Sequence, residues 1–243
     1  ALEAMVENDP EVHAFLLGQI RKKLEDYQYG PDRVLWELLQ NADDAAVQLR
    51  EMLSRGAGNE RVAHRFRIEA APDQVRITHW GRQINQHTLA GFHDGRRRGW
   101  DLDLLNMMVL NTSDKMPEHG TTGHFGLGFK SVYLVTDRPR VGSGQLAFEV
   151  VAGMLPTAIG QTPVREEEWS RQEPPTVFEL DLDRPELLDA VLRDLEAFGG
   201  LAPLFCRALS EIELVRGERR AVALWEPHPV PGVDGMWTGV GST

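Results

Sequence analysis

The chain has 243 residues, of which 42% are hydrophobic, so it can bury a full core without disulfides or metal ions. Its 37 acidic against 26 basic residues give a net charge of −11, which argues against a broad nucleic-acid-binding or anionic-membrane surface. The single cysteine, Cys206, excludes an internal disulfide and fits a reducing compartment, so we expect a cytoplasmic location. The sequence contains no apolar run of about 18 residues that could span a membrane.

The first third of the chain predicts two helices followed by two short strands. Apolar side chains recur at helical spacing across residues 11–26 and again across residues 33–54. Residues 65–70 and 75–80 have strand-like composition and flank a turn. Residues 91–122 mix glycine, charge and one apolar patch, which is typical of a partly ordered, mobile segment.

The rest of the chain alternates between further strands and one helix. The expected elements are a glycine-rich turn and short helix over 123–135, strands over 145–153 and 176–182, a helix over 185–198, a hairpin over 211–225, and loops or tails over 160–175 and 226–243. This order predicts an α+β fold, a two-layer sandwich with helices packed on one face of a mixed, mainly antiparallel sheet.

The second predicted helix carries a narrow polar stripe. Glu37, Asn41, Asp44 and Gln48 stand at i, i+4, i+7 and i+11, so their side chains share one face. The amide oxygen of Asn41 can bind Mg²⁺, and Glu37 can orient and deprotonate a water for attack on a phosphate. The alternative is the solvated face of an amphipathic helix.

A glycine run follows in the second half of the chain. Gly123, Gly126 and Gly128 let backbone N–H groups approach a polyphosphate closely, and the helix that starts next adds its positive dipole end. The run is not a P-loop, because Phe129 separates Gly128 from Lys130. Taken alone, it also fits a simple tight turn.

Together these segments resemble a known family. ELLQNADDA (37–45) resembles the first motif of the Bergerat (GHKL) ATP-binding fold, which sacsin, the 90-kDa heat-shock chaperones, type II topoisomerases and histidine kinases share. TGHFGLGFKSVYLVTD (122–137) resembles the glycine motif at the end of the ATP lid in sacsin-type and heat-shock-chaperone N-terminal domains. VRITHWGRQI (75–84) takes the place of the Asp-x-Gly-x-Gly motif, and PTVFEL (175–180) that of the late Gly-Thr strand. The resemblance is closest to the sacsin-type N-terminal domain and covers about residues 10–215.

The resemblance implies ATP and Mg²⁺ as cofactors and gives each matching residue a role. Glu37 matches the general base and Asn41 the Mg²⁺ ligand, while residues 91–122 match the lid. The residues expected to bind the nucleotide are Asn41, Asp44, Ala45, His79, Gly81, Ser113, Lys115, Gly123, Gly126, Leu127, Gly128, Phe129, Lys130 and Thr176.

The second motif departs from the family pattern. His79 replaces the aspartate that anchors adenine, Gln83 replaces the second glycine, and only Gly81 keeps its register. A neutral imidazole can accept a hydrogen bond from the adenine amino group through one nitrogen, provided that it has the right tautomer. The alternative is a structural histidine, either buried or exposed at a strand end.

We therefore expect Mg–ATP binding and slow hydrolysis by a domain of residues 1–218, with residues 219–243 leading to a following domain of a longer protein. By analogy with the family, the cycle would drive conformational change in a chaperone-like protein, with downstream domains, protein clients or a second copy as partners. Nucleic acid and membrane are not expected partners. Two alternatives remain open, a nucleotide sensor that does not hydrolyse ATP and a protein-interaction scaffold on the same fold.

Overall fold

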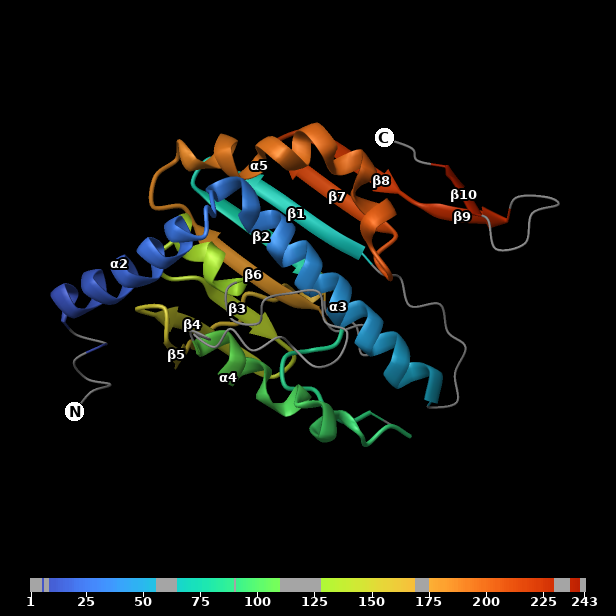
Figure 1. Ribbon diagram of the computed structural model, residues 1–243, viewed down its shortest axis with the longest axis horizontal. Coiled ribbons are helices and arrows are strands. Elements are labelled where there is room, and N and C mark those ends of the chain that lie inside the picture. The colour runs from blue at the N-terminus through green and yellow to red at the C-terminus, as the bar shows by residue number, and fades with distance from the viewer. Residues whose placement is uncertain are drawn as a thin grey trace.

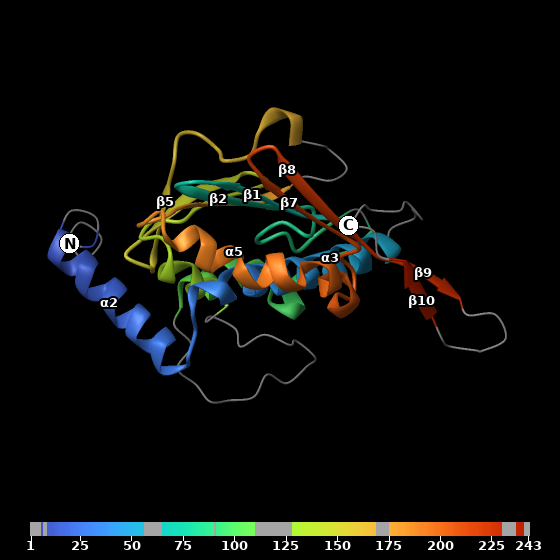
Figure 2. The ribbon, with the colours of Figure 1, turned by 90° about the horizontal axis from the view of Figure 1, so that it is seen from above.

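The computed structural model describes residues 6, 9–55, 65–89, 91–109, 128–168, 175–229 and 237–240. Its centre is a mixed eight-stranded open sheet, with helices α2, α3 and α5 on one face (Figures 1 and 2). The strand order is β5-β4-β3-β6-β2-β1-β7-β8, and all neighbouring strands are antiparallel except the parallel pair β1–β7. The strands of this sheet are β1 (Arg65–Ala71), β2 (Gln74–His79), β3 (Arg140–Ser143), β4 (Leu146–Val151), β5 (Leu155–Ala158), β6 (Thr176–Asp181), β7 (Glu211–Arg216) and β8 (Arg219–Leu224). The α+β class and the mainly antiparallel sheet are thus confirmed.

In the part of the chain that the structure describes, four α-helices with given bounds and several short 3-10 helices accompany the sheet. The α-helices are α2 (Pro10–Asp26), α3 (Val34–Arg55), α4 (Asp103–Met108) and α5 (Leu187–Phe198). The 3-10 helices are η1 (Pro31–Arg33), η2 (Gly95–Arg98), η3 (Trp100–Leu102), η4 (Phe129–Leu134), η5 (Glu166–Glu168) and η6 (Gly199–Phe205). The Asp9 side chain caps α2 by accepting from two backbone N–H groups, and Pro10 supplies the preset φ of the first helical position. None of the helices in the described part of the chain is both long and apolar enough to cross a membrane.

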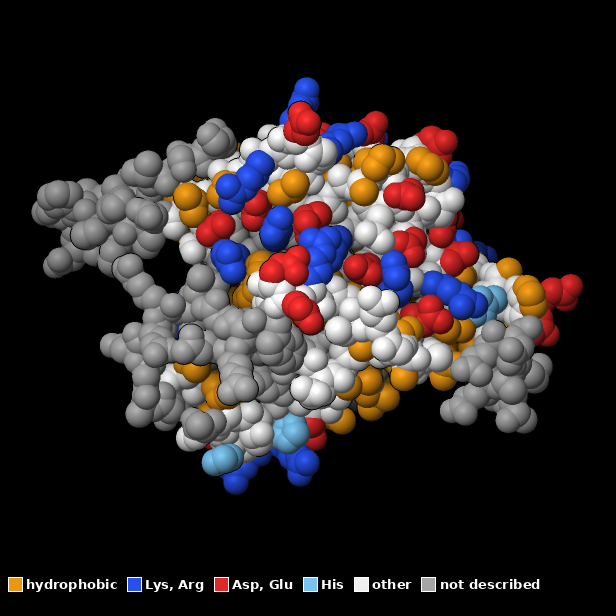
Figure 3. Space-filling model, turned by 180° about the vertical axis from the view of Figure 1, so that it is seen from behind, with side chains coloured by type: hydrophobic (Ala, Val, Ile, Leu, Met, Phe, Trp, Pro, Cys, Tyr) orange, Lys and Arg blue, Asp and Glu red, His pale blue; other side chains and the backbone are white. Residues whose placement is uncertain are grey.

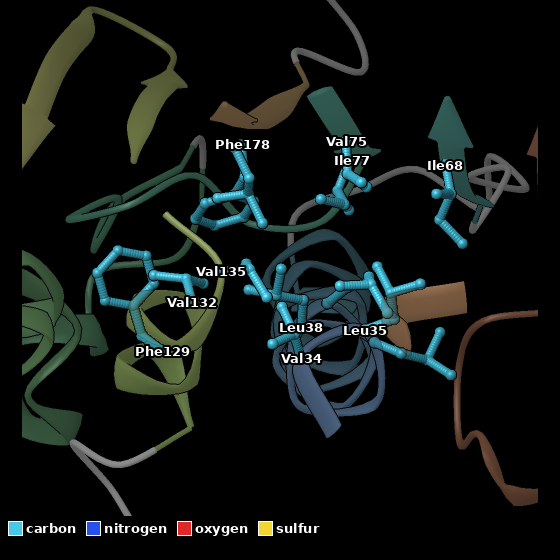
Figure 4. Packing of buried hydrophobic residues seen from close by; sticks show 14 of the residues in the cluster. Val34, Leu35, Leu38, Ile68, Val75, Ile77, Phe129, Val132, Val135 and Phe178 are labelled. Carbon is cyan, nitrogen blue, oxygen red and sulfur yellow. The ribbon is translucent and has the colours of Figure 1, made fainter. Parts of the chain in front are cut away.

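The core lies between α3 and the sheet. Leu35 and Leu38 of α3 face Ile68 and Ile77 of β1 and β2 (Figure 4). Phe178 of β6 extends the same cluster toward η4. Each of these fully buried side chains stabilises the fold by about 1.5–3 kcal/mol relative to exposure, so the contact fixes α3 against the sheet.

The opposite face of the sheet is charged, as the view from behind shows (Figure 3). Arg76 of β2 is only 2% exposed there, and its guanidinium contacts Glu168 of η5 at 2.5 and 2.6 Å and Glu69 of β1 at 3.0 Å. The segment that carries Glu168 covers the middle of this face. This cover explains why β2 is buried on both of its faces, unlike β1, whose buried side chains alternate.

Several expectations from the sequence needed correction. Strands β3 and β5 were not predicted. The tail over 226–243, predicted as a loop, contains a second, two-stranded sheet of β9 (Glu226–Pro229) and β10 (Trp237–Val240). Within the predicted lid, the described residues 91–109 form η2, η3 and α4.

Candidate functional site

A pocket of about 170 Å³ lies between α3, α4 and the ends of the central strands. It is lined by Glu37, Asn41, Asp44, Ala45, Gln48, His79, Arg82, Gln83, Ile84, Asp103, Asn106, Met107, Gly128, Phe129, Thr176 and Phe178. Most of the predicted nucleotide-binding residues that the structure describes are in this set, although they come from four separate parts of the chain.

The polar stripe of α3 forms one wall. Glu37, Asn41, Asp44 and Gln48 all line the pocket, so the stripe faces a cavity, and Asn41 is also exposed to solvent. Gly128 faces its first two members, since a Cβ placed on Gly128 would lie 2.8 Å from Glu37 Oε2 and 3.6 Å from Asn41 Nδ2. The predicted acid–amide pair therefore lies against the last glycine of the glycine run, at the start of η4.

The adjacent aspartates Asp43 and Asp44 of α3 make different contacts. Asp43 points away from the pocket and accepts from the backbone N–H groups of Arg207, Ala208 and Leu209 at 2.8–2.9 Å. Asp44 lines the pocket and forms an ion pair with the Arg207 side chain. Burial is the largest cause that raises the pKa of Asp44, while Arg207 opposes the rise. Only Asp44 was a candidate from the sequence, and only Asp44 reaches the pocket.

Tyr29, in the turn before η1, contacts Glu37. Burial and the neighbouring Glu37 carboxylate raise the pKa of the Tyr29 phenol to about 12, so the phenol stays protonated and can donate to Glu37. A protonated phenol at this position can hold the Glu37 carboxylate in one orientation. Tyr29 was missed from the sequence because it precedes the helix that carries the motif and belongs to no recognisable pattern.

The far end of the pocket is formed by the ends of β2 and β6, where His79 and Thr176 are register partners. His79 is 5% exposed, its Nδ1 accepts from the Gly81 backbone N–H at 3.2 Å, and its ring stacks on Phe178 with centroids 6.2 Å apart. Burial lowers the pKa of His79 to about 4, so the imidazole is neutral at physiological pH. His79 is therefore buried rather than exposed at the end of its strand, and its contact with a nucleotide base stays a prediction.

Gly81 does not line the pocket but allows the chain after β2 to approach α3 closely. A Cβ at Gly81 would lie 2.8 Å from backbone atoms of Ala45 and Ala46, so any other residue would push the end of β2 away from α3. The glycine allows this close approach.

Arg82 links α4 to α3 beside the pocket. Its two terminal nitrogens donate to the Asp103 carboxylate at 2.7 and 2.9 Å, and its Nε donates to Gln48 Oε1 at 2.7 Å. The guanidinium also lies 4.8 Å above the Trp100 ring. Arg82, Asp103 and the α4 residues that line the pocket were not predicted, because they match no motif and the predicted lid was expected to be mobile.

Lys130 is not brought to the pocket. Its Nζ donates to the carbonyl oxygens of Met108, at 3.0 Å, and Gly153, and burial lowers its pKa to about 8. It thus ties the end of α4 to the β4–β5 turn. The remaining predicted residues Ser113, Lys115, Gly123, Gly126 and Leu127 lie outside the described part of the chain.

Fold and site together define a two-layer α+β domain that holds a pocket, lined by polar and apolar side chains, between a helix and the ends of its sheet. Residues 13–173, more than half of the chain, match the family model of the Sacsin domain, and the chain belongs to this family. A comparison with curated proteins finds no match.

Proposed function

We propose that this domain binds Mg–ATP in the pocket, hydrolyses it slowly, and uses the cycle to drive conformational change in a larger protein. The triphosphate would lie between the polar stripe of α3 and the start of η4. The nucleotide base would lie at the end formed by His79, Thr176 and Phe178. The proposal takes the domain to be a sacsin-type member of the Bergerat fold, with residues 91–122 as its lid.

The single observation that carries the proposal is the contact of Glu37 and Asn41 with Gly128. A carboxylate, a carboxamide and a glycine backbone around one cavity suit a water, a cation and a phosphate group, respectively. Glu37 would accept the proton of the attacking water, and Tyr29 would hold the carboxylate in place. Catalysis of this kind depends on positioning and charge stabilisation, so the isolated domain should be slow.

The donor set fits Mg²⁺ only in the presence of a nucleotide. No group of three or more His, Cys, Asp or Glu side chains that could hold a metal ion occurs among the residues described. Protein-bound Mg²⁺ often keeps several waters and takes one or two protein oxygens together with substrate phosphates. The Asn41 amide oxygen would supply such a ligand, and the bound cation would neutralise phosphate charge.

The test is a comparison of Glu37→Gln with the wild type. We expect unchanged Mg–ATP binding and a loss of phosphate release of about 100-fold or to background, because general-base catalysis contributes about 10²–10⁴-fold. Glu25→Gln, which changes an exposed glutamate on α2, is the matched control and should hydrolyse like the wild type.

Two other outcomes correspond to the rival functions. Phosphate release at background in both proteins, with saturable ATP binding retained, would support a nucleotide sensor. The histidine at position 79, where the family has an aspartate, also favours this function. No saturable binding at millimolar Mg–ATP would refute the proposal and leave an interaction scaffold.

A further inference from the structure

The tautomer of His79 determines what its end of the pocket can bind. A backbone N–H can only donate, so the Gly81 amide fixes Nδ1 as the acceptor nitrogen of the ring. Because burial keeps the imidazole neutral, its one proton must then lie on Nε2. His79 is therefore a hydrogen-bond donor at Nε2.

This donor is directed into the pocket. Within the part of the chain that the structure describes, no group accepts a hydrogen bond from Nε2. This nitrogen keeps accessible surface, and the cavity that His79 lines is the space open to it. Phe178, which stacks on the His79 ring, and Thr176, its register partner, are both uncharged. A single buried N–H thus faces an otherwise neutral, partly aromatic surface that suits a flat heterocycle.

We infer that His79 recognises the nucleotide base by donating from Nε2 to an unprotonated ring nitrogen, and not by accepting from an exocyclic amino group. The inference rests on the proposed function, since it assigns the base-recognition chemistry of the same pocket. A carboxylate at this position would require a donor on the base, whereas Nε2–H requires an acceptor, so the polarity of recognition is reversed. An adenine amino group then contributes little to affinity, because Nε2–H cannot accept from it.

The test uses wild-type domain with Mg²⁺ and a set of triphosphates in competition binding. Purine riboside triphosphate, which lacks the amino group, should bind within about twofold of ATP. Among the 1-deaza, 3-deaza and 7-deaza analogues of ATP, in which C–H replaces one ring nitrogen, one should bind about three- to tenfold more weakly, the worth of one neutral hydrogen bond. His79→Phe, which keeps a ring but removes both nitrogens, should abolish that difference.

A measurement without nucleotide checks the premise. Long-range ¹H–¹⁵N spectra of the folded domain should show a protonated Nε2 and an unprotonated Nδ1 for His79. The opposite assignment would overturn the inference, whether or not His79→Phe folds.

The binding outcomes separate the two proposals. If ATP binds but loss of the amino group weakens binding tenfold, or if none of the deaza analogues binds more weakly than ATP, the inference about His79 is wrong and nucleotide binding stands. If no nucleotide binds saturably, the proposed function fails and this inference fails with it.

Discussion

His79 is neutral because it is buried and has no carboxylate partner, which makes its protonation a measurable part of stability. Its pKa of about 4 in the folded state lies below the 6.5 of an exposed histidine, so the unfolded chain takes up the proton first as the pH falls. Its contribution is therefore complete above pH 6.5 and is lost as the pH falls from 6.5 to about 4.

We predict that wild-type protein loses on the order of 3 kcal/mol more unfolding free energy between pH 7.5 and pH 4 than His79→Phe does. Urea denaturation of both proteins across this range measures the difference. Substitution of His93, which is exposed, is the control for the removal of an imidazole from the surface. Parallel curves for wild type and His79→Phe would contradict a neutral, buried His79.

Gly128 gives a direct test of the geometry around Glu37. Its φ of −55° is open to any residue, but an alanine Cβ would lie 2.8 Å from Glu37 Oε2, so the carboxylate must move. We predict that Gly128→Ala folds with a stability change within about 1 kcal/mol and loses at least about tenfold in ATP hydrolysis. Gly18→Ala is the control, because nothing lies within 4 Å of its Cβ, and it should retain full activity.

At this scale, periodicity predicted which side chains of α3 share a face, whereas their role as a site was implied only by the family resemblance. The helical spacing of Glu37, Asn41, Asp44 and Gln48 sufficed to place their side chains on one face. The roles of Tyr29 and Arg82 could not be predicted, since their contacts join parts of the chain that are distant in sequence or lack a repeating pattern.

Among the elements, α4 depends on contacts at both of its ends. Arg82 holds Asp103 at its start, and Lys130 binds the carbonyl of Met108 at its end. Residues 103–108 are only six in number, too few for a stable isolated helix, so these contacts stabilise it in place.

We predict that Lys130→Met, which keeps the length of the side chain but removes its donors, speeds hydrogen–deuterium exchange in residues 103–108. Exchange in α3 should change little, because local opening needs far less free energy than global unfolding. Lys22→Met on the exposed side of α2 is the matched control. Unaltered exchange in 103–108 would show that the Lys130 contact does not stabilise α4.

The long elements were predictable and the short ones were not. Helix α3 and strands β1 and β2 carry clear periodic patterns, and the structure agrees with them closely. Strand β3 has four residues, including a glycine and a serine, and β5 contains Pro156. Their strand conformation comes from hydrogen bonding to β4 and β6 rather than from local preference.

Across the whole molecule, the two faces of the sheet are stabilised differently. The face toward α3 is covered by apolar packing, and the opposite face, which carries Arg76, is covered through ion pairs. Arg76 at 2% exposure depends on Glu168, which reaches it from a segment nearly a hundred residues away along the chain.

We predict that Glu168→Ala destabilises the fold by about 3 kcal/mol, since it leaves much of a buried guanidinium charge uncompensated. Glu167→Ala, which changes an exposed neighbour, should cost less than about 0.5 kcal/mol. Urea denaturation measures both. The double substitution Arg76→Met with Glu168→Leu should recover much of the loss, and its failure to do so would show that the pair is not the main cause.

Strand β6 has a consequence for how the molecule can be divided. It begins at Thr176, just beyond the 13–173 stretch that matches the family model, yet it sits between β3 and β2 in the middle of the sheet. A chain trimmed to the matched stretch would leave two separate sheets, β5-β4-β3 and β2-β1. Each would have an edge strand with unpaired backbone N–H and C=O groups, which promotes aggregation. The smallest fragment that can fold on its own therefore extends beyond residue 173, at least through β6.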